Sequence, residues 1–421
     1  MKHEFGRKQI YLTLILSVIF GATSLVDLGT PANPLNPIVL KLRYLLVGTG
    51  FILLFLMKHQ EDRQGNTFWS FDSKTSPLLW SWLLLCFALV VSATVKNDAL
   101  SLRDSYWLLL GVPIIFFRVL PRLMEDYGSR IVPLSLVLGH LPYLLVSLVR
   151  FPPYSFPENF YRGVYANSNQ LGFSCVVITL GTLILMIGSI MNKKPVYYSV
   201  ILGALLLTSL VTICYAYSRT SLITFLFLSG ICLFIFFQKR PKGFVQITFV
   251  LACLFSLLLH QIDRFILFIF YDLQLNLAEI TGKKSNSLSG RDTIWLETIQ
   301  DWKFFGHGHG YHEERFGLGA HNSVMTILGN HGLIAAYLSL LFILGSLICT
   351  YIYFKRNFAN NYYAVAPWLV TVCFWTLSMG EDMFGSLGKG ITLGYFACLG
   401  IVMTKPKTEE LPQTKLTKMH S

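Results

Sequence analysis

Long apolar runs separated by short polar segments dominate the chain. Most runs extend for about 17 to 25 residues, which is enough for an α-helix to cross about 30 Å of hydrocarbon. We predict twelve spans, of which the fourth is short, at residues 10–26, 44–57, 78–95, 105–117, 131–149, 170–191, 196–215, 220–237, 244–262, 333–353, 365–380 and 390–404. The pattern predicts an all-α polytopic membrane protein with about 12 transmembrane helices.

The composition supports one membrane domain rather than several soluble ones. Of 421 residues, 53% are hydrophobic and only 13% are charged, whereas soluble domains carry about 25% charged residues. We therefore predict a single helical membrane domain over residues 1–404 and a basic tail over 405–421. No convincing cleavage site follows the first apolar run, so we interpret it as a span rather than a removed signal.

The basic residues predict the orientation of the chain. The net charge is +12, but the lysines and arginines stand in small groups between apolar runs, as the positive-inside rule requires, and not in one nucleic-acid-binding patch. Their distribution places both termini in the cytoplasm. Residues 263–322 then form one large extracytoplasmic loop with short helices, opened by an interfacial helix over about 263–280.

Residues 289–332 gather polar groups that the rest of the chain lacks. Ser289 and Asp292 have the spacing of a capping box, which puts Arg291 in the first turn of a helix. Free backbone N–H groups and the helix dipole favour an anion there, and a phosphate is the natural guest. The alternative is an ion pair of Arg291 with Asp292, Glu297 or a lipid headgroup.

The helices of this region have predictable packing. Trp295, Ile299 and Trp302 form an apolar stripe that we expect to pack on the membrane domain. The apolar stretch after residue 321 is too long for one upright span, so Gly329 and Gly332 are expected to break it.

A glycine-rich turn carries three closely spaced histidines, His307, His309 and His312. They raise a zinc hypothesis, which is weak because the loop is flexible and shows no clear carboxylate ligand geometry. The eight cysteines all lie in apolar runs without a CxxC pair and are expected to be packing residues. We predict neither a metal nor a cofactor.

Polar residues near the ends of other spans are further candidates. Arg219 lies between two apolar runs on the predicted outer side, where the topology rule disfavours positive charge, which indicates a functional role. Asn167 and Asn169 can cap a helix or bind sugar hydroxyls. Arg162 can also serve as an interfacial anchor.

His321 precedes Asn322 at the start of a predicted helix. A neutral imidazole there could take a proton from a hydroxyl, although a lone histidine is more often structural. Glu381 and Asp382 reach the same predicted side, where they act as a base or pair with the arginines.

Four stretches together resemble the bacterial O-antigen ligase and O-antigen polymerase superfamily. They are SRTS (218–221), SGRDTIW with FFGHGHG (289–310), HNSVMTILGNHGLIA (321–335) and RGVYANSNQLG (162–172). Their order, spacing and predicted outward side match, and the resemblance covers roughly residues 160–350.

The resemblance implies a metal-independent, inverting glycosyltransferase of the multispanning (GT-C-like) type in the bacterial plasma membrane. Its donor would be a glycan linked to undecaprenyl diphosphate, and its acceptor a sugar hydroxyl at the outer face. Carried over to this sequence, Arg219 and Arg291 would bind the diphosphate, and His321 would orient or deprotonate the acceptor.

The remaining candidate residues form a predicted substrate-binding set. It contains Arg162, Asn167, Asn169, Asn322, His312 and Arg315. Ser168 stands where the family often has proline, and the histidine-rich turn leaves His312 as an alternative base.

A polymerase that joins repeat units of capsule, exopolysaccharide or O-antigen is the favoured function. A ligase that moves finished glycan onto a lipid or wall acceptor has the same motifs and chemistry. A transporter or flippase is less favoured, because internal repeats and midplane polar groups are missing from the sequence pattern. Membrane lipid, a flippase and a chain-length regulator are candidate partners, and nucleic acid is not.

Overall fold

The computed structural model describes residues 6–30, 33–34, 37–63, 76–152, 160–239, 291–384 and 389–404. This part of the chain is almost entirely helical. Within it, the only strands are β1 (Gly29–Thr30) and β2 (Asn33–Pro34), which pair antiparallel.

The described residues include nine helices that are long and apolar enough to cross a membrane. Their elements are α1 (Arg7–Thr23) with η1 (Ser24–Asp27), α2 (Pro37–Arg63), α3 (Ser76–Val95), α4 (Ala99–Tyr106) continued by the π-helical η3 (Trp107–Gly111) and η4 (Pro113–Val119) and by α5 (Leu120–Met124), α6 (Gly128–Arg150), α7 (Ser168–Met191), α8 (Val196–Ala216), α9 (Arg219–Lys239) and α14 (Leu333–Asn357). Two shorter apolar helices follow, η7 (Tyr362–Val365) with α15 (Ala366–Ser378), and α16 (Gly390–Met403).

These helices confirm the predicted all-α polytopic membrane protein. Every predicted span except 244–262 coincides with a helix, and the doubtful fourth span belongs to a continuous run of 26 residues, Ala99–Met124. The span at 244–262, the interfacial helix, Ser289 and the tail at 405–421 lie outside the described residues. The total of twelve spans therefore stays a prediction.

Small residues allow close contact between the helices of the bundle. A side chain at Gly21 of α1 would place its Cβ 2.6 Å from the carbonyl oxygen of Gly139 in α6. Such contacts replace the hydrophobic driving force that is missing between helices in lipid.

An aromatic cluster marks the core of the bundle. The ring of Trp82 lies 5.7 Å from Phe117, 5.1 Å from Phe342, 6.0 Å from Phe384 and 5.4 Å from Phe396, measured between ring centroids. Phe384 belongs to the segment that follows α15. The start of that segment is thus anchored in the core of the protein.

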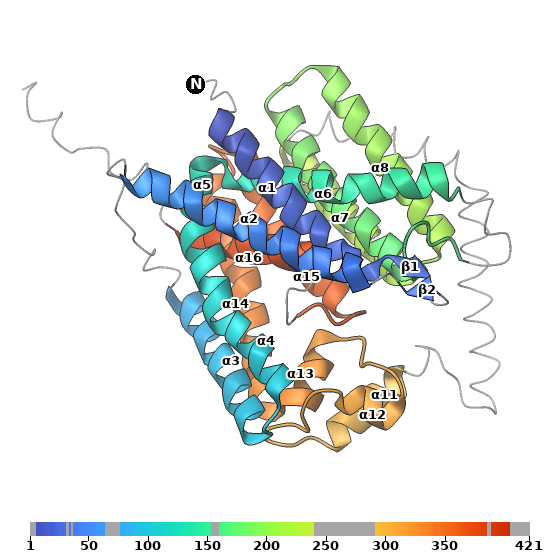
Figure 1. Ribbon diagram of the computed structural model, residues 1–421. Helices are drawn as coiled ribbons and strands as arrows, with labels where there is room; N and C mark the ends of the chain where they lie inside the picture. Colours follow the sequence, from blue (N-terminus) through green and yellow to red (C-terminus); the bar gives the residue numbers. More distant parts are fainter. Residues whose placement is uncertain are drawn as a thin grey trace, which may run out of the picture.

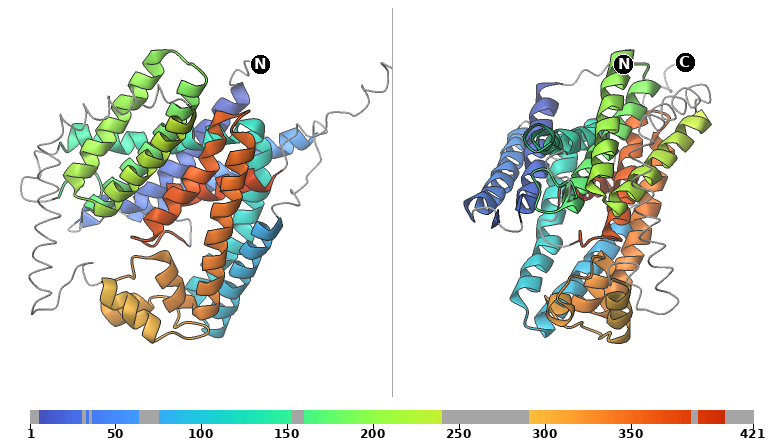
Figure 2. Two further views of the ribbon diagram at one scale, coloured as in Figure 1. Left: turned by 180° about the vertical axis from the view of Figure 1, so that it is seen from behind. Right: turned by 90° about the vertical axis from the view of Figure 1, so that its right-hand side faces the viewer.

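Three short helices gather at one end of the bundle, beside the ends of α3 and α4 (Figures 1 and 2). They are α11 (Arg291–Gln300), α12 (Tyr311–Phe316) and α13 (Ser323–His331). The start of α1 and the turn between α7 and α8 lie at the opposite end. Gly332, with φ +89°, separates α13 from α14, which confirms the predicted break.

The prediction that the apolar stripe of α11 packs on the membrane domain is wrong. The buried residues of α11 are Ile294 and Thr298, whereas Ile299 and Trp302 are 49% and 45% exposed. The reason is that α11 packs on the short helix α13. Periodicity identified a helix with an apolar face, but the neighbour that covers α11 could not be read from it.

Candidate active site

His321, Glu381 and Arg291 form one polar cluster. Nδ1 of His321 lies 3.0 Å from Oε2 of Glu381, and the Arg291 guanidinium lies 3.9 Å from Oε1 of the same carboxylate. Arg291 also donates a 3.0 Å hydrogen bond to the carbonyl of Gly380. The Glu381 side chain is only 14% exposed, so solvent screens these charges less than it would on an open surface. The cluster combines a proton acceptor with a fixed guanidinium.

The loop after α15 is held against the start of α13 by Ser323. The backbone N–H groups of Met383 and Phe384 donate to the Ser323 hydroxyl oxygen at 2.9 Å and 3.3 Å. The same hydroxyl donates to the carbonyl of Glu381 at 3.4 Å. Because Ser323 lies two residues after His321, these bonds fix the Glu381 carboxylate beside the imidazole.

Arg291 lies in the first turn of α11, as predicted. The indole N–H of Trp295 donates a 2.7 Å hydrogen bond to the carbonyl of Ala320, the residue before His321. This bond fixes α11 next to His321. The ion pair of Arg291 is with Glu381, a distant residue that the local alternatives, Asp292 and Glu297, did not include.

Asn322 caps α13. Its side-chain oxygen accepts hydrogen bonds from the backbone N–H groups of Val324 and Met325 at 3.0 Å and 3.1 Å, and its amide nitrogen lies 3.4 Å from the Met379 carbonyl. The residue is buried. This geometry favours a structural role, and substrate binding by Asn322 stays a prediction.

Arg219 is the first residue of α9, which contacts the loop after α15 from the side opposite Arg291. A Cβ placed on Gly380 would lie 2.7 Å from Thr220, so Thr220 packs directly on Gly380. Gly380 is also the carbonyl that Arg291 binds. The start of α9 next to Arg219 and the side chain of Arg291 therefore both contact Gly380. The Arg219 side chain is exposed. Their joint role as diphosphate ligands stays a prediction.

The asparagine motif lies at the start of α7. The Asn167 side chain accepts a 2.8 Å hydrogen bond from the Asn169 backbone N–H, which establishes the capping role for Asn167. Arg162 is half-buried in the preceding loop. That loop pairs with the end of the first span through the bridge between Leu28 and Tyr165. Sugar binding by these residues stays a prediction.

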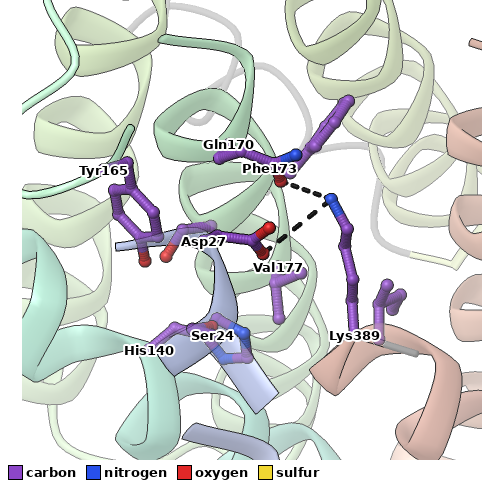
Figure 3. Close-up of a pocket in the computed structure, with 10 residues that line it drawn as sticks. Ser24, Asp27, His140, Tyr165, Gln170, Phe173, Val177 and Lys389 are labelled. Atoms are coloured by element: carbon purple, nitrogen blue, oxygen red, sulfur yellow. Dashed lines mark hydrogen bonds and ion pairs between the residues drawn. The ribbon is translucent and has the colours of Figure 1, made fainter. Parts of the chain in front are cut away.

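Lys389 joins the loop after α15 to this region, although the sequence pattern gave it no role (Figure 3). Its ammonium donates a hydrogen bond to the Gln170 side chain, lies 3.9 Å from the Asp27 carboxylate and lies 5.1 Å from the centre of the Phe173 ring. These contacts connect the beginning of α16 with the beginning of α7 and the end of the first span.

The histidine-rich turn is shaped by close approach of two backbones. Gly306, Gly308 and Gly310 have φ values of +64°, +103° and +81°, a region that favours glycine. The N–H of His307 donates to the Gly329 carbonyl at 2.8 Å, which ties the turn to the end of α13. Among the residues that the structure describes, no group of three histidine, cysteine or acidic side chains could hold a metal ion.

His312 and Arg315 stabilise this unit internally. His312 is 1% exposed and lies 3.2 Å from the Thr298 hydroxyl, and burial lowers its pKa to about 4. Arg315 forms a hydrogen-bonded ion pair with Asp301 and lies 3.7 Å from Glu297. Both contacts favour structural roles. Substrate binding by His312 or Arg315, and the alternative of His312 as the base, stay predictions that this geometry does not favour.

Residues 204–340 match the model of a family described as O-antigen ligase. The match begins within α8, contains Arg219, Arg291 and His321, and ends within α14. The predicted superfamily is confirmed. The match supports a function of the O-antigen ligase or polymerase type, and thus an enzyme. A comparison with curated proteins found no match.

Proposed function

We propose that this O-antigen ligase family protein is a polysaccharide polymerase. It transfers a saccharide from undecaprenyl diphosphate to a sugar hydroxyl at the outer face of the bacterial plasma membrane. The contact of His321 and Arg291 with one carboxylate, Glu381, carries the proposal. This cluster supplies a base and a cation within one shielded site, as transfer from a diphosphate requires.

His321 acts on the acceptor. The Glu381 carboxylate accepts a hydrogen bond from Nδ1–H, which leaves Nε2 of His321 without a proton and available as a base. As the acceptor oxygen attacks the anomeric carbon, its proton passes to Nε2. Such a base contributes about 10²- to 10⁴-fold to a rate.

Arg291 and Arg219 act on the leaving group. The bond between the anomeric carbon and the phosphate oxygen breaks, and the electron pair stays on the diphosphate. The Arg291 guanidinium, which donates to Gly380, and that of Arg219, whose neighbour Thr220 packs on the same glycine, stabilise that charge. Attack from the opposite face inverts the anomeric carbon, and no metal ion is needed in this scheme.

The positions of the two ends of the helix bundle support a site that faces outward. The cluster lies with α11 and α13 at one end of the bundle, opposite the start of α1 and the α7–α8 turn (Figure 1). Basic residues gather near the latter end, at Arg7, Lys8, Lys193 and Lys194. By the positive-inside rule, that end faces the cytoplasm.

Reconstitution of the full chain in vesicles, with the lipid-linked glycan pool of its source cells, tests this function. A ladder of products is expected for a polymerase, and a single addition to a lipid or wall acceptor would identify the ligase instead. Arg291→Ala should abolish either product without loss of membrane insertion. Normal polymer from Arg291→Ala would refute the diphosphate role, and loss of activity with chelator, restored by a divalent ion, would refute metal independence.

A further inference from the structure

A cavity of about 330 Å³ lies between α4, α13 and the loop that follows α15. Its volume is at the lower end of the range of about 300 to 1,000 Å³ for small-molecule sites. Asp382, which directly follows Glu381, lines this cavity. The cavity thus begins next to Glu381, the residue that contacts His321, and extends along α13 to His331.

The walls of the cavity present groups that bind hydroxyls. Ser101, Asp104 and Ser105 line it from α4, and Thr326 and Asn330 line it from α13. Hydroxyl, amide and carboxylate groups provide both donors and acceptors, which is what a polyhydroxylated ligand needs.

Two of the lining residues contain polar atoms that the protein leaves unsatisfied. The side-chain oxygen of Asn330 and Nδ1 of His331 are buried, and neither has a hydrogen-bond partner among the described residues. Leaving a buried polar atom unpaired costs about 1 to 3 kcal/mol. Both residues line the cavity, where the hydroxyl groups of a ligand could supply the missing partners. They therefore point to a ligand rather than to packing alone.

The cavity is lined by charged groups of both signs. Arg43, Lys389, Asp104 and Asp382 line it, although Asp104 also bonds Arg103, Lys389 also bonds Gln170, and burial raises the pKa of Asp382 to about 7. Burial also lowers the pKa of His331 to about 4, so its imidazole is neutral at pH 7. The hydroxyls of a saccharide can donate to the carboxylates and accept from the cationic groups, so such a ligand matches this mixture of donors and acceptors.

We propose that this cavity is a saccharide-binding site, in which Asn330 and His331 bind sugars of the acceptor whose terminal hydroxyl reaches His321. The acceptor role rests on the proposed function, whereas saccharide binding in the cavity does not.

Binding is tested with the full chain in nanodiscs. The probe is the reducing oligosaccharide that mild acid releases from the lipid-linked glycan pool of the source cells, and saturation-transfer NMR measures its binding. Asn330→Leu should weaken binding at least about tenfold, since a directional contact of about 1.4 kcal/mol is lost. Thr326→Val, which keeps the side-chain shape, should weaken it by a smaller factor. Asn360→Leu, in an exposed turn, is the matched control and should bind as the parent protein does.

The outcomes separate this inference from the proposed function. Arg291→Ala should bind the oligosaccharide normally although it makes no polymer. A parent protein that does not bind the probe, or Asn330→Leu and Thr326→Val proteins that bind it unchanged, would overturn the cavity as a saccharide site. Polymer formation by Arg291→Ala would instead refute the proposed function and leave the binding result intact.

Discussion

The imidazole of His321 lies 3.0 Å from the carboxylate of Glu381, a residue 60 positions later in the chain. Neither residue alone would identify a catalytic base. Their contact fixes one nitrogen of the ring against a negative charge and leaves the other for substrate. The same carboxylate faces Arg291. One side chain therefore orients the proposed base and lies beside the proposed diphosphate ligand.

Glu381→Gln should reduce transfer at least about tenfold while the protein stays folded. The amide can donate to Nδ1, which stabilises the tautomer with the proton on Nε2 and removes the free base. The rate of transfer at equal amounts of folded protein measures the effect. Glu314→Gln, at an exposed position of α12, should be as active as the parent. Equal rates for both variants would contradict the orienting role.

Gly380→Ala should impair activity, because its Cβ would lie 2.7 Å from Thr220 and the start of α9 would have to shift. Overpacking of this kind costs about 1 to 3 kcal/mol. Thr220→Ala in the same protein should restore part of the transfer rate. Gly230→Ala is the matched control, because nothing lies within 4 Å of a Cβ at that position of α9. A Gly380→Ala protein as active as the parent would show that transfer does not depend on the close packing between the start of α9 and Gly380.

The unit formed by α11, α12 and α13 should lose stability in mild acid. Burial, with a smaller effect of nearby His307 and an opposing one of Glu313, lowers the pKa of His312 from 6.5 to about 4. The unfolded chain therefore binds a proton that the folded one does not, so stability is complete above about pH 6.5 and falls as the pH decreases towards 4. Limited proteolysis from pH 7 to pH 4.5 measures this, and His312→Gln should flatten the dependence. His331 contributes in the same direction, so a residual slope is expected.

The outward orientation can be tested by labelling intact cells with a membrane-impermeant maleimide. Leu318→Cys, which replaces a side chain that is 53% exposed after α12, should react. Val196→Cys, 77% exposed at the start of α8, should be protected until the cells are opened. The native cysteines in the described part of the chain are mostly buried, so the parent protein sets a low background. Protection of Leu318→Cys with labelling of Val196→Cys would invert the proposed topology.

Local patterns predicted local structure well. Apolar run length found the spans that lie in the described part of the chain, and the helix that contains Arg291 and the break at Gly332 followed from residues next to each other in sequence. Local geometry gives Asn322 a capping role that the sequence had not assigned, and a contact between distant segments gives Arg291 its ion-pair partner. Asn322 is a cap, and Arg291 pairs with Glu381 rather than with a neighbour.

The less predictable parts depend on tertiary contacts. Ser323 and Lys389 drew no attention as single polar residues, yet each holds the loop after α15 in place. The histidine-rich turn resembled a metal site because of its residue types. Its glycines instead allow the backbone to approach the end of α13, a requirement that appears only when both segments are placed together.

The backbone of His321 has a φ of +50°, a left-handed conformation that few residues other than glycine adopt readily. An alanine substitution there would combine two effects, the loss of the imidazole and a change of backbone preference. Asparagine tolerates this conformation better and cannot act as the same base. His321→Asn is therefore the more interpretable variant for genetic complementation, and a null result from alanine alone would not distinguish missing chemistry from a displaced loop.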